Sequence, residues 1–504
     1  MEISLKRNIF ANYASQIYVT LIGILTVPLY IKYMGVEAYG LVGFFAMMQA
    51  WFTLLDMGLT NTISRETARL RGGVSDALSY RRLVRALEGI FLVIALLGGG
   101  ILFATSDYIA QDWLQANQLP IVEVKTAIQI MAALVALRWM CGLYRGVIIG
   151  AERLVWLSGY ASLMATLRFI GVLPVLIFVG ATPTIFFSYQ FAVAILEYAG
   201  FLFQAYCLFP AVSSSKRLSW SWKPLMPVLK FSLTIAATTS LWVLVTQVDK
   251  LVLSKILPLS EYGYFTLAVL VASVVGVVSG PIVSAIQPRM AKLEAEGDHV
   301  GLIRLYRDST QVVAVIAGAL ASTFTFFSEL LLWAWTGDVN LAHQTAPILI
   351  LYSIGNCFLA VGAFQYYLQF AKGDLYLHFI GQCWYTALIV PSLIWAASQF
   401  GGIGSGYVWI AINILFFVVW VPLVHHRFVS GLNKVWFGRD VLPIFIITAL
   451  TSYFLFLIMP QTNSRWLQFS MVAIAGLFVM LAGALASSFF LSRAKSLLIQ
   501  EKLN

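Results

Sequence analysis

The sequence predicts an all-α polytopic integral membrane protein. Of its 504 residues, 60% are hydrophobic and 11% are charged, and the mean hydropathy is +0.85. Soluble domains carry about 25% charged residues, so this composition excludes an ordinary soluble fold. The alternating segments of about 10 residues that are typical of transmembrane barrels are lacking in the sequence. Long apolar runs fill the chain instead.

The apolar runs have the length that membrane-spanning helices need. A helix of about 20 residues crosses a hydrocarbon core of about 30 Å. Fourteen runs of spanning length lie at residues 9–31, 39–63, 84–105, 124–149, 154–179, 184–209, 227–249, 262–286, 309–335, 346–370, 375–398, 403–424, 441–459 and 467–490. We therefore predict about 14 transmembrane helices.

The basic residues predict the orientation of the chain. With a cytoplasmic N-terminus, the inner loops and tails hold 25 of the 32 Lys and Arg residues, and the outer loops hold five. Because Lys and Arg are enriched in cytoplasmic loops, both termini are predicted to be cytoplasmic. The net charge of +10 then reflects topology and not a nucleic-acid-binding surface. The first run lacks a small-residue cleavage site, so it is interpreted as a span rather than a signal peptide.

Two runs carry arginines where charge is costly. Arg138 lies near the centre of run 124–149, and Arg168 near the centre of run 154–179. An arginine at such a depth costs about 2.5–3.5 kcal/mol and usually faces a partner, a bundle interior or a wet cavity. Arg145 follows Arg138 by seven residues and therefore shares its helix face. We interpret the three arginines as an anion-binding site, with structural pairing to Glu197 as the alternative.

Uncharged polar residues within the runs are candidates for contacts with sugars. These are Asn12 and Gln16 in the first run, and Gln365 and Gln369 in the second half of the chain. Amide side chains both donate and accept hydrogen bonds, which suits a cavity lined for sugars. Hydrogen bonding between helices is the alternative for the first pair.

Three carboxylates in or near the spans are candidates for ion coupling or gating. They are Asp56, Glu88 and Glu197. Because arginine does not titrate, coupling to a proton would have to run through such groups. The sequence leaves open whether H⁺ or Na⁺ is coupled to transport. For Asp56, the alternative role is to cap a helix or to pair with basic residues of the inner loop.

Motifs for catalysis, cofactors and metals are lacking in the sequence. It contains no Walker motif, dinucleotide fingerprint or nucleophile elbow. The four cysteines all fall inside apolar runs and lack metal-ligand spacing. His425-His426 has no carboxylate or thiol at ligand spacing, so both histidines are predicted to lie on a solvated surface. We expect a protein that is not an enzyme, with no catalytic residues, metal site or cofactor.

The two halves of the sequence resemble each other. An offset of 223 residues aligns Tyr39-Gly40 with Tyr262-Gly263 and Gly58 with Pro281, and an offset of 221 aligns the turn 150–154 with 371–375. Six helices in each repeat predict two lobes of the same orientation, related by an axis along the membrane normal. Gly58 and Pro281 are predicted to be matched helix breakers that let their helices bend during transport.

The repeat defines the predicted domain organisation: two pseudo-symmetric six-helix lobes plus two C-terminal helices. The first lobe is expected at residues 1–209 and the second at 227–424, with a cytoplasmic linker at 210–226. Residues 425–504 hold a loop, the two extra transmembrane helices and a cytoplasmic tail.

One stretch of the sequence resembles a known family. It is Tyr33-Met34-Gly35-Val36-Glu37-Ala38-Tyr39-Gly40-Leu41, followed by Leu55-Asp56-Met57-Gly58-Leu59 and Arg65-Glu66. This pattern resembles Wzx-type O-antigen flippases, in the polysaccharide branch of the multidrug/oligosaccharidyl-lipid/polysaccharide (MOP) exporter superfamily. In topology the resemblance covers the whole chain.

The resemblance implies a function. Such proteins move undecaprenyl-diphosphate-linked oligosaccharide repeat units across the bacterial inner membrane, and their cavities are typically cationic. The implied partners are the lipid-linked oligosaccharide, membrane lipid, a polysaccharide polymerase and a chain-length regulator. The implied mechanism is alternating access from the cytoplasmic to the periplasmic leaflet.

Three other functions are considered. Related peptidoglycan-precursor flippases carry arginines in their first helix, whereas this chain has none between residues 8 and 64. An ion-coupled drug antiporter of the same superfamily would need carboxylates in its cavity and usually ends after twelve helices. A membrane glycosyltransferase, polymerase or ligase would need an acidic or histidine cluster, and the short outer loops have none.

The predicted orientation can be tested by cysteine labelling. Single cysteines in loops 70–80, 212–222 and 294–300, in a variant without the native cysteines, should be shielded from an impermeant thiol reagent in intact cells. They should react once the cells are lysed. Labelling of all three from outside would reverse the predicted topology.

Overall fold

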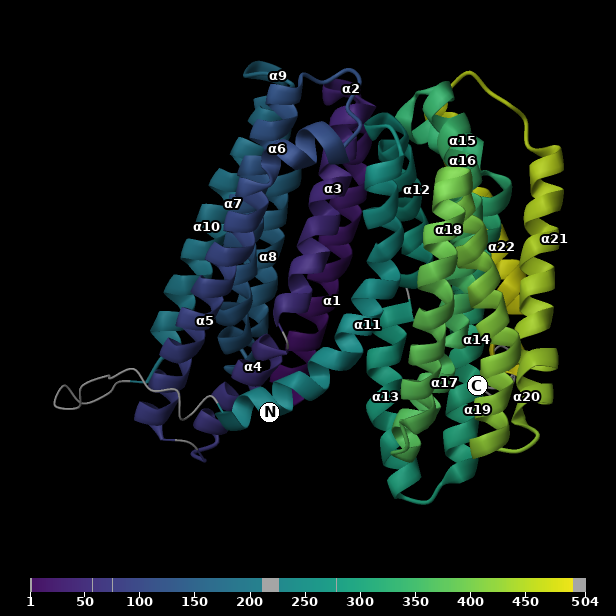
Figure 1. The fold of residues 1–504 in the computed structure, drawn as a ribbon. Helices are drawn as coiled ribbons and strands as arrows, with labels where there is room; N and C mark the ends of the chain where they lie inside the picture. Colours follow the sequence, from purple (N-terminus) through teal and green to yellow (C-terminus); the bar gives the residue numbers. More distant parts are fainter. Residues whose placement is uncertain (1, 57, 75, 211–225, 278, 493–504) are drawn as a thin grey trace. The chain divides into compact units, whose positions relative to one another are not determined.

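The protein is described here as a computed structural model, which covers residues 2–56, 58–74, 76–210, 226–277 and 279–492. These residues form helices joined by short turns, with one isolated β-bridge between Gln115 and Pro258 (Figure 1). Internal contacts divide the chain into two compact units, Met1–Gly263 and Tyr264–Asn504. The predicted lobe boundaries, drawn from the sequence repeat, stay a prediction.

The predicted all-α membrane fold is confirmed. In the described residues, 12 stretches are long and apolar enough to cross a membrane. One of them, Tyr376–Phe428, spans 53 residues and is divided at Gly401, whose φ of 58° is not helical. It therefore covers two predicted runs, 375–398 and 403–424. The run 227–249 lies in the helix Met226–Ile256.

The first unit contains the helices of the N-terminal half and the segment that leads into the second unit. They are α1 (Glu2–Leu25), α2 (Val27–Met34), α3 (Val36–Phe52), η1 (Thr53–Asp56), α4 (Leu59–Arg71), α5 (Ala77–Ala104), α6 (Ser106–Tyr108), η2 (Ile109–Trp113), α7 (Ile121–Gly150), α8 (Leu154–Phe169), α9 (Val172–Phe178), α10 (Pro183–Leu208), α11 (Met226–Ile256) and the first turn of α12 (Leu259–Val277).

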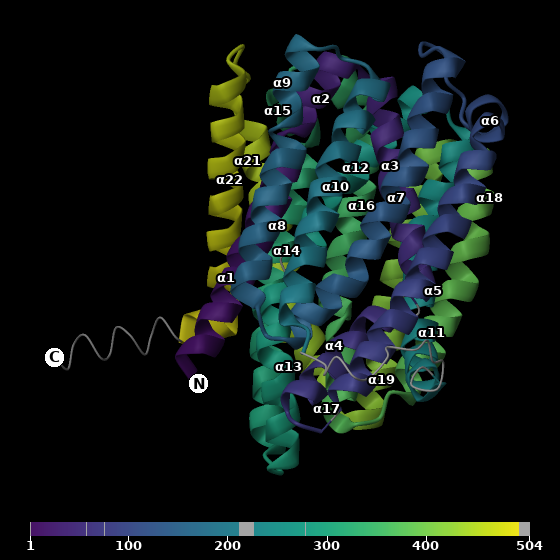
Figure 2. The same cartoon turned by 90° about the vertical axis from the view of Figure 1, so that its left-hand side faces the viewer.

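Helix α7 lies at the centre of the first unit. It packs against α10, α5, α4 and α3, while α1 packs against α8. Figure 2 shows α5, α7, α10 and α8 running alongside one another. Burial on several sides explains why α7 lacks a single apolar stripe: its sequence must be apolar nearly all round. Between residues 126 and 150 of this helix, Arg138 and Arg145 are the charged residues.

The second unit holds the remaining elements. They are the rest of α12, α13 (Ser279–Ala295), α14 (His299–Phe326), α15 (Ser328–Thr336), α16 (Val339–Gly362), α17 (Phe364–Lys372), α18 (Tyr376–Leu415), η3 (Phe416–Trp420), α19 (Val421–Phe428), α20 (Leu432–Val435), η4 (Trp436–Val441), α21 (Leu442–Ile458) and α22 (Arg465–Ala486).

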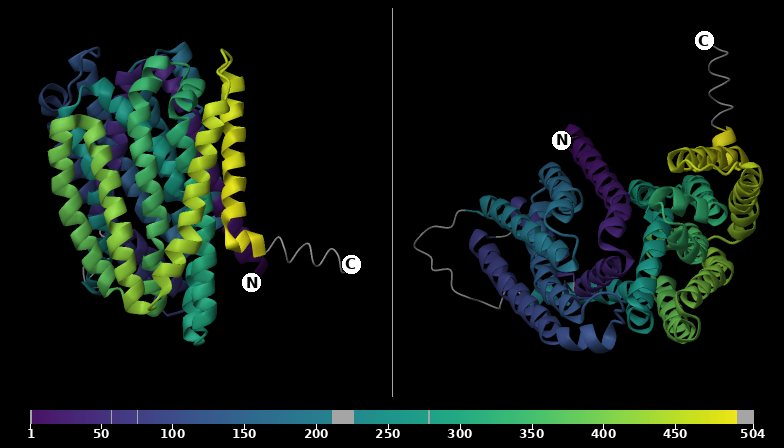
Figure 3. Two further views of the ribbon diagram at one scale, coloured as in Figure 1. Left: turned by 90° about the vertical axis from the view of Figure 1, so that its right-hand side faces the viewer. Right: turned by 90° about the horizontal axis from the view of Figure 1, so that it is seen from above.

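Helix α14 is the centre of the second unit, as α7 is of the first. It packs against α16, α21, α22 and α13. The two C-terminal helices α21 and α22 also pack against each other, as the yellow pair in Figure 3 shows. These two helices therefore belong to the second unit.

The sequence repeat is reflected in equivalent contacts. The offsets of 223 and 221 align Arg71 with Glu294 and Ala151 with Lys372. In the first unit Arg71 donates a hydrogen bond to the Ala151 carbonyl. In the second unit Lys372 Nζ lies 2.9 and 2.8 Å from the two carboxylate oxygens of Glu294. Each repeat thus ties the end of one short helix to the same turn, with different chemistry.

The Glu294–Lys372 contact predicts a pH dependence. Partial burial acts to raise the pKa of the Glu294 carboxyl, but the hydrogen bond and charge of Lys372, with help from His299, hold that pKa below its usual range. A lowered carboxyl pKa stabilises the fold above the unfolded pKa, and this stability is lost as the pH falls through the folded pKa. An ion pair of this kind contributes about 0.5–1 kcal/mol.

Lys372→Met should therefore lower the midpoint of thermal unfolding in detergent at pH 7. The difference from the natural protein should shrink as the pH falls below about 4.3, the ordinary value for glutamate. Lys292→Met, which removes an exposed partner of Glu296, serves as the matched control and should have little effect. A Lys372→Met difference that is independent of pH would contradict this account.

Candidate functional site

The predicted helix 154–179 is interrupted, and the interruption positions Arg168. Helix α8 ends at Phe169, and α9 begins at Val172. Pro174, in the first turn of α9, has no amide N–H and cannot donate the bond that would continue the helix. Arg168 therefore lies in the last turn of α8, where the carbonyl end of a helix favours a positive charge.

Side chains of neighbouring helices bond the carbonyl groups at this break. Three donors do so: Tyr189 Oη to the Leu167 oxygen at 2.9 Å, Gln190 Nε2 to the Arg168 oxygen at 2.9 Å and Tyr30 Oη to the Phe169 oxygen at 2.7 Å. Because the bilayer interior offers no water, backbone groups freed within a span need partners from the protein. The break is therefore stabilised by side chains of the first unit.

Arg168 also forms an ion pair. Its Nη2 lies 2.7 Å from Glu197 Oε2, and the two side chains are 22% and 15% exposed. The pairing that the sequence raised as an alternative is therefore present for Arg168. It brings α8 and α10 together at the level of the break.

Arg138 has neutral partners. Its Nη1 donates to Gln49 Oε1 at 3.4 Å, and its Nη2 donates to Gln190 Oε1 at 3.2 Å. Its guanidinium also lies over the Phe45 ring, 5.3 Å from the centroid. None of these groups carries a negative charge. Within the described residues, therefore, the charge of Arg138 is solvated by dipoles and a ring face.

Gln190 joins the two arginines. Its amide oxygen accepts from Arg138, its amide nitrogen donates to the Arg168 carbonyl, and the residue is 4% exposed. Arg138, Gln190, Arg168 and Glu197 thus form one network across α7, α8 and α10. With two guanidinium groups and one carboxylate, the network holds one positive charge in excess. The sequence did not single out Gln190, because a lone glutamine in an apolar run carries no motif.

The network keeps donor capacity that the described contacts do not use. The Nε atoms of Arg138 and Arg168 are buried and have no hydrogen-bond partner among the described residues, as is also true of Arg81 and Arg82. An unpaired Nε alone therefore does not mark a site. The excess positive charge within a predicted span is the further feature, because such a charge favours an anionic ligand. The role of these arginines as ligands stays a prediction.

Arg145 lies outside this network. It is exposed on α7, about 10 Å along the helix from Arg138 at 1.5 Å per residue. Asn12 and Gln16 are exposed on α1. The neighbouring Ser15 makes the contact with α8 instead, through the Ser158 carbonyl and Ser162 Oγ, both at 2.9 Å.

The candidate carboxylates have distinct surroundings. Asp56 Oδ1 accepts hydrogen bonds from the Thr60 hydroxyl at 2.5 Å and the Thr60 amide at 3.2 Å, so Asp56 caps the start of α4. Glu88 Oε1 accepts hydrogen bonds from the hydroxyls of Tyr144 at 3.1 Å and Tyr206 at 3.0 Å. Glu197 is paired with Arg168, as described above.

The two predicted breakers, Gly58 and Pro281, have different settings. Gly58 has a φ of 72° and precedes α4, a left-handed conformation that side chains other than glycine disfavour. Pro281 lies in the helical segment α13 (Ser279–Ala295), and the residue between this segment and α12 is outside the described part of the chain. Whether either helix bends there during transport stays a prediction.

Gln365 and Gln369 lie on α17 in the second unit. Gln369 is fully buried, and its amide nitrogen donates to the side-chain and backbone oxygens of Gln365. The two residues thus bond to each other. Their role as sugar ligands stays a prediction.

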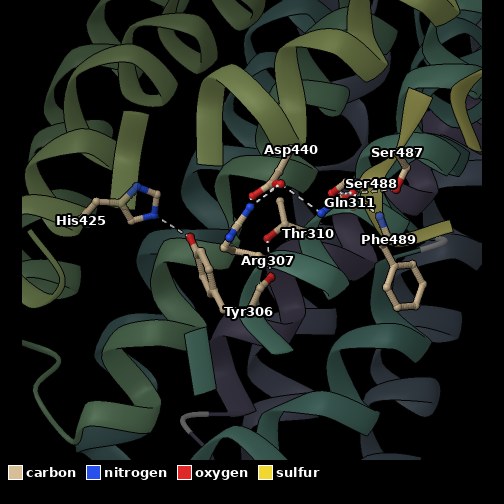
Figure 4. Close-up of polar contacts among 9 residues, drawn as sticks. All are labelled: Tyr306, Arg307, Thr310, Gln311, His425, Asp440, Ser487, Ser488 and Phe489. Carbon is tan, nitrogen blue, oxygen red and sulfur yellow. Dashed lines mark hydrogen bonds and ion pairs between the residues drawn. The ribbon is translucent and has the colours of Figure 1, made fainter. Parts of the chain in front are cut away.

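The second unit contains a buried polar network that the sequence did not indicate (Figure 4). Arg307 forms a two-point ion pair with Asp440, at 2.6 and 2.9 Å, and Gln311 Nε2 donates to the same carboxylate at 3.0 Å. Gln311 Oε1 accepts from Ser487, Ser488 and the Phe489 amide. Asp440, just before α21, and residues 487–489, just after α22, are therefore both bonded to α14.

His425 is part of the same region, and the prediction that it lies on a solvated surface is wrong. It is fully buried, with Nε2 2.7 Å from Tyr306 Oη and Nδ1 3.0 Å from Asn433 Oδ1. Its neighbour His426 is exposed, as predicted. The prediction treated the two adjacent histidines alike, whereas successive residues of a helix face different directions.

The chain matches a family model described as polysaccharide biosynthesis protein over residues 5–294. It belongs to this family. No match was found among curated proteins. The predicted resemblance to the polysaccharide branch of the MOP superfamily is confirmed by the family match together with the fold.

Solved structures show the same fold. The lipid II flippase MurJ, in an inward closed conformation, is 16% identical with a TM-score of 0.74, over 94% of this chain and 97% of that one. An inward-facing multidrug resistance MATE family transporter of the MOP superfamily is 13% identical with a TM-score of 0.68, over 82% and 96%. A MOP superfamily transporter from Pyrococcus furiosus is 13% identical with a TM-score of 0.57, over 86% and 96%. The chain therefore shares the multi-pass membrane fold of these proteins.

The bonded helix break gives a stability prediction. Tyr30→Phe and Tyr189→Phe each remove one hydroxyl from a break carbonyl and leave the ring in place. A buried carbonyl without its partner costs about 1–3 kcal/mol, so each variant should unfold at a lower temperature in detergent.

Tyr18→Phe is the matched control. Its hydroxyl lies on α1 and bonds the Thr166 side chain of α8, the helix that carries the break carbonyls, at 2.7 Å, in an exposed position. This variant should be nearly as stable as the natural protein. An equal fall in unfolding temperature in all three variants would contradict the idea that the hydrogen bonds at the break contribute more than an exposed one.

Proposed function

We propose that the protein is a flippase for undecaprenyl-diphosphate-linked oligosaccharide repeat units of O-antigen or a similar polysaccharide. It moves them from the cytoplasmic to the periplasmic leaflet of the bacterial inner membrane, with both termini in the cytoplasm. The excess positive charge of the Arg138–Gln190–Arg168–Glu197 network carries this proposal. The family match and the transporter fold support it.

The network suits a diphosphate. Arg138 is hydrogen-bonded to neutral side chains, and guanidinium groups bind phosphate oxygens through two parallel hydrogen bonds. Arg168 exchanges Glu197 for the ligand. Arg145 attracts the head group from the inner side, and Asn12, Gln16, Gln365 and Gln369 bind sugars. The polyprenyl tail stays in membrane lipid.

Displacement of Glu197 provides a route to ion coupling. Once Arg168 binds phosphate, Glu197 is left as a carboxylate in a span without its counter-ion, which is unfavourable unless it takes up a proton or Na⁺. Release of the ligand then restores the pair. Asp56 caps a helix and Glu88 is bonded by tyrosines, so Glu197 is the carboxylate most directly linked to the ligand.

Two neighbouring functions are less well supported. A peptidoglycan-precursor flippase would also handle a lipid diphosphate, but this chain carries no arginine between residues 8 and 64. A drug antiporter that takes cations would not be served by a site with excess positive charge. In the cell, the flipped product would pass to a polysaccharide polymerase and its chain-length regulator.

Substitution of the two arginines tests the proposal. Lysine keeps the charge but loses the two-point geometry, whereas glutamine loses the charge. We expect about tenfold lower transport for Arg138→Lys, and about a hundredfold lower for Arg138→Gln, since hydrogen bonds to charged groups contribute about 1.5–3 kcal/mol. Arg168 variants should behave similarly, and the double Gln variant should be inactive.

The measurement is surface O-antigen-like polymer in a flippase-deleted host, normalised to membrane-inserted protein. Arg69→Gln, which removes an exposed arginine of the first unit, is the control and should complement fully. Complementation by the double Gln variant at normal expression would overturn the diphosphate role. Rescue of both protein level and polymer by Glu197→Gln would assign the arginines a structural role alone.

A further inference from the structure

The helices around the arginine network (Arg138, Gln190, Arg168 and Glu197) form two pairs. Helix α1 packs against α8, and α10 packs against α7. The first pair is joined by hydrogen bonds outside the network, from Ser15 to the Ser158 carbonyl, from Ser162 to Ser15, and between Tyr18 and Thr166. Arg168 lies on α8, whereas the other three network residues lie on α7 and α10. The network therefore lies at the junction of the two pairs.

Arg168 is bonded to α10 through both its side chain and its backbone. Its guanidinium pairs with Glu197 at 2.7 Å, and its carbonyl accepts a hydrogen bond from Gln190 Nε2 at 2.9 Å. Two further bonds between α8 and α10, from Tyr160 to the Leu196 carbonyl and from Tyr189 to the Leu167 carbonyl, do not involve an arginine side chain. The contacts of Arg168 can therefore exchange while the two helices stay joined.

The orientation of the Gln190 side-chain amide is determined by its two partners. A guanidinium only donates hydrogen bonds and a carbonyl only accepts them. Oε1 of Gln190 must therefore face Arg138, and Nε2 must face the Arg168 carbonyl, as observed. Gln190 is also buried. A rotation of this amide breaks both bonds together.

A phosphate at Arg138 would act on this amide. Phosphate oxygens are charged acceptors and form stronger hydrogen bonds with a guanidinium than an amide oxygen does. Once Nη2 of Arg138 turns to the phosphate, Oε1 of Gln190 is left without its donor, which is unfavourable inside a span. A rotation that gives Oε1 a new donor withdraws Nε2 from the Arg168 carbonyl.

We infer that Gln190 is a positioning residue that couples ligand binding in the arginine network to the break between α8 and α9. The inference rests on the proposed flippase function, in which Arg168 exchanges Glu197 for the diphosphate. Ligand binding then releases both the carbonyl and the side chain of Arg168 from α10. The end of α8 moves away from α10 and stays with α1. The transporter thereby changes shape only when its anionic head group is bound.

A distance measurement tests the coupling. Leu163 on α8 and Ile195 on α10 are both exposed, so spin labels can be attached to Leu163→Cys/Ile195→Cys in a variant without the four native cysteines. The probe is radiolabelled farnesyl diphosphate, a short polyprenyl diphosphate, with farnesol as the compound that lacks phosphate. Binding of the diphosphate should lengthen the mean distance between the labels by about 2 Å or more, and farnesol should not.

The matched control pair is Ile17→Cys/Leu163→Cys, because Ile17 is exposed on α1, which stays with α8. The distance between these two labels should not change when the probe binds. A change as large as that of the α8–α10 pair would contradict the inference that α8 moves with α1.

Substitutions at two positions separate coupling from binding. Gln190→Leu keeps every charge of the network but neither bond of the amide, so it should still bind the probe and should not lengthen the α8–α10 distance. Glu197→Gln keeps both bonds of Gln190, so it should still lengthen that distance.

A double variant covers the case in which Gln190→Leu does not fold. Gln190→Glu alone places a carboxylate beside Arg138 and cancels the excess charge, so it should weaken probe binding at least about tenfold. Gln190→Glu/Glu197→Gln restores one positive charge in excess and should recover the binding. Its carboxylate cannot donate to the Arg168 carbonyl, so the distance should not respond, in contrast to Glu197→Gln alone.

The outcomes distinguish this inference from the proposed function. If the natural network binds the probe but the α8–α10 distance stays the same, the coupling is wrong and the diphosphate site stands. A full response in Gln190→Leu, or in the double variant, would also overturn the role of Gln190. Failure of the natural protein to bind the probe would instead count against the diphosphate site, and the inference would fall with it.

Discussion

Within the hydrocarbon core every charge and every freed backbone group must find its partner inside the protein, and the first unit is arranged around that constraint. The break between α8 and α9 exposes carbonyls, and Tyr30, Tyr189 and Gln190 bond them. The same break gives Arg168 the negative end of a helix. Gln190 then extends the arrangement to Arg138. Local backbone chemistry and the placement of charge thus have one common cause.

The two repeats have different side chains at matched positions of equivalent helices. Positions matching Arg138 and Arg168 in the second half are Leu359 and Ile389. Near the first of these, Asn356 Nδ2 donates to the Ala272 carbonyl at 2.9 Å, which is a neutral contact between the equivalent helices. The positions that match the two arginines are therefore uncharged in the second repeat. A ligand with an anionic head and a neutral chain suits a protein built in this way.

The sequence alone predicted the features that depend on the combined properties of many residues. Apolar run length gave the helices, and the cost of buried charge identified Arg138 and Arg168 as residues in need of partners. It could not supply those partners. Gln190 is an isolated amide, and the break at Gly171 is caused by a proline three residues on, inside a run that is mostly apolar. His425 and Asp440 were assigned to a loop by hydropathy, although their burial follows from helix packing against α14.

The two buried networks differ in a way that bears on their roles. Around Asp440 the charges cancel, because Arg307 meets the carboxylate with two bonds and Gln311 completes it. A pair of this kind is costly to open, since one charge would be stranded, so it suits a permanent joint that fixes α21 and α22. Around Gln190 the charges do not cancel, and Arg138 has neutral partners that a stronger anion can displace. Under the proposed function, an incomplete balance of charge, rather than burial itself, distinguishes the arginine network from the neutral network around Asp440.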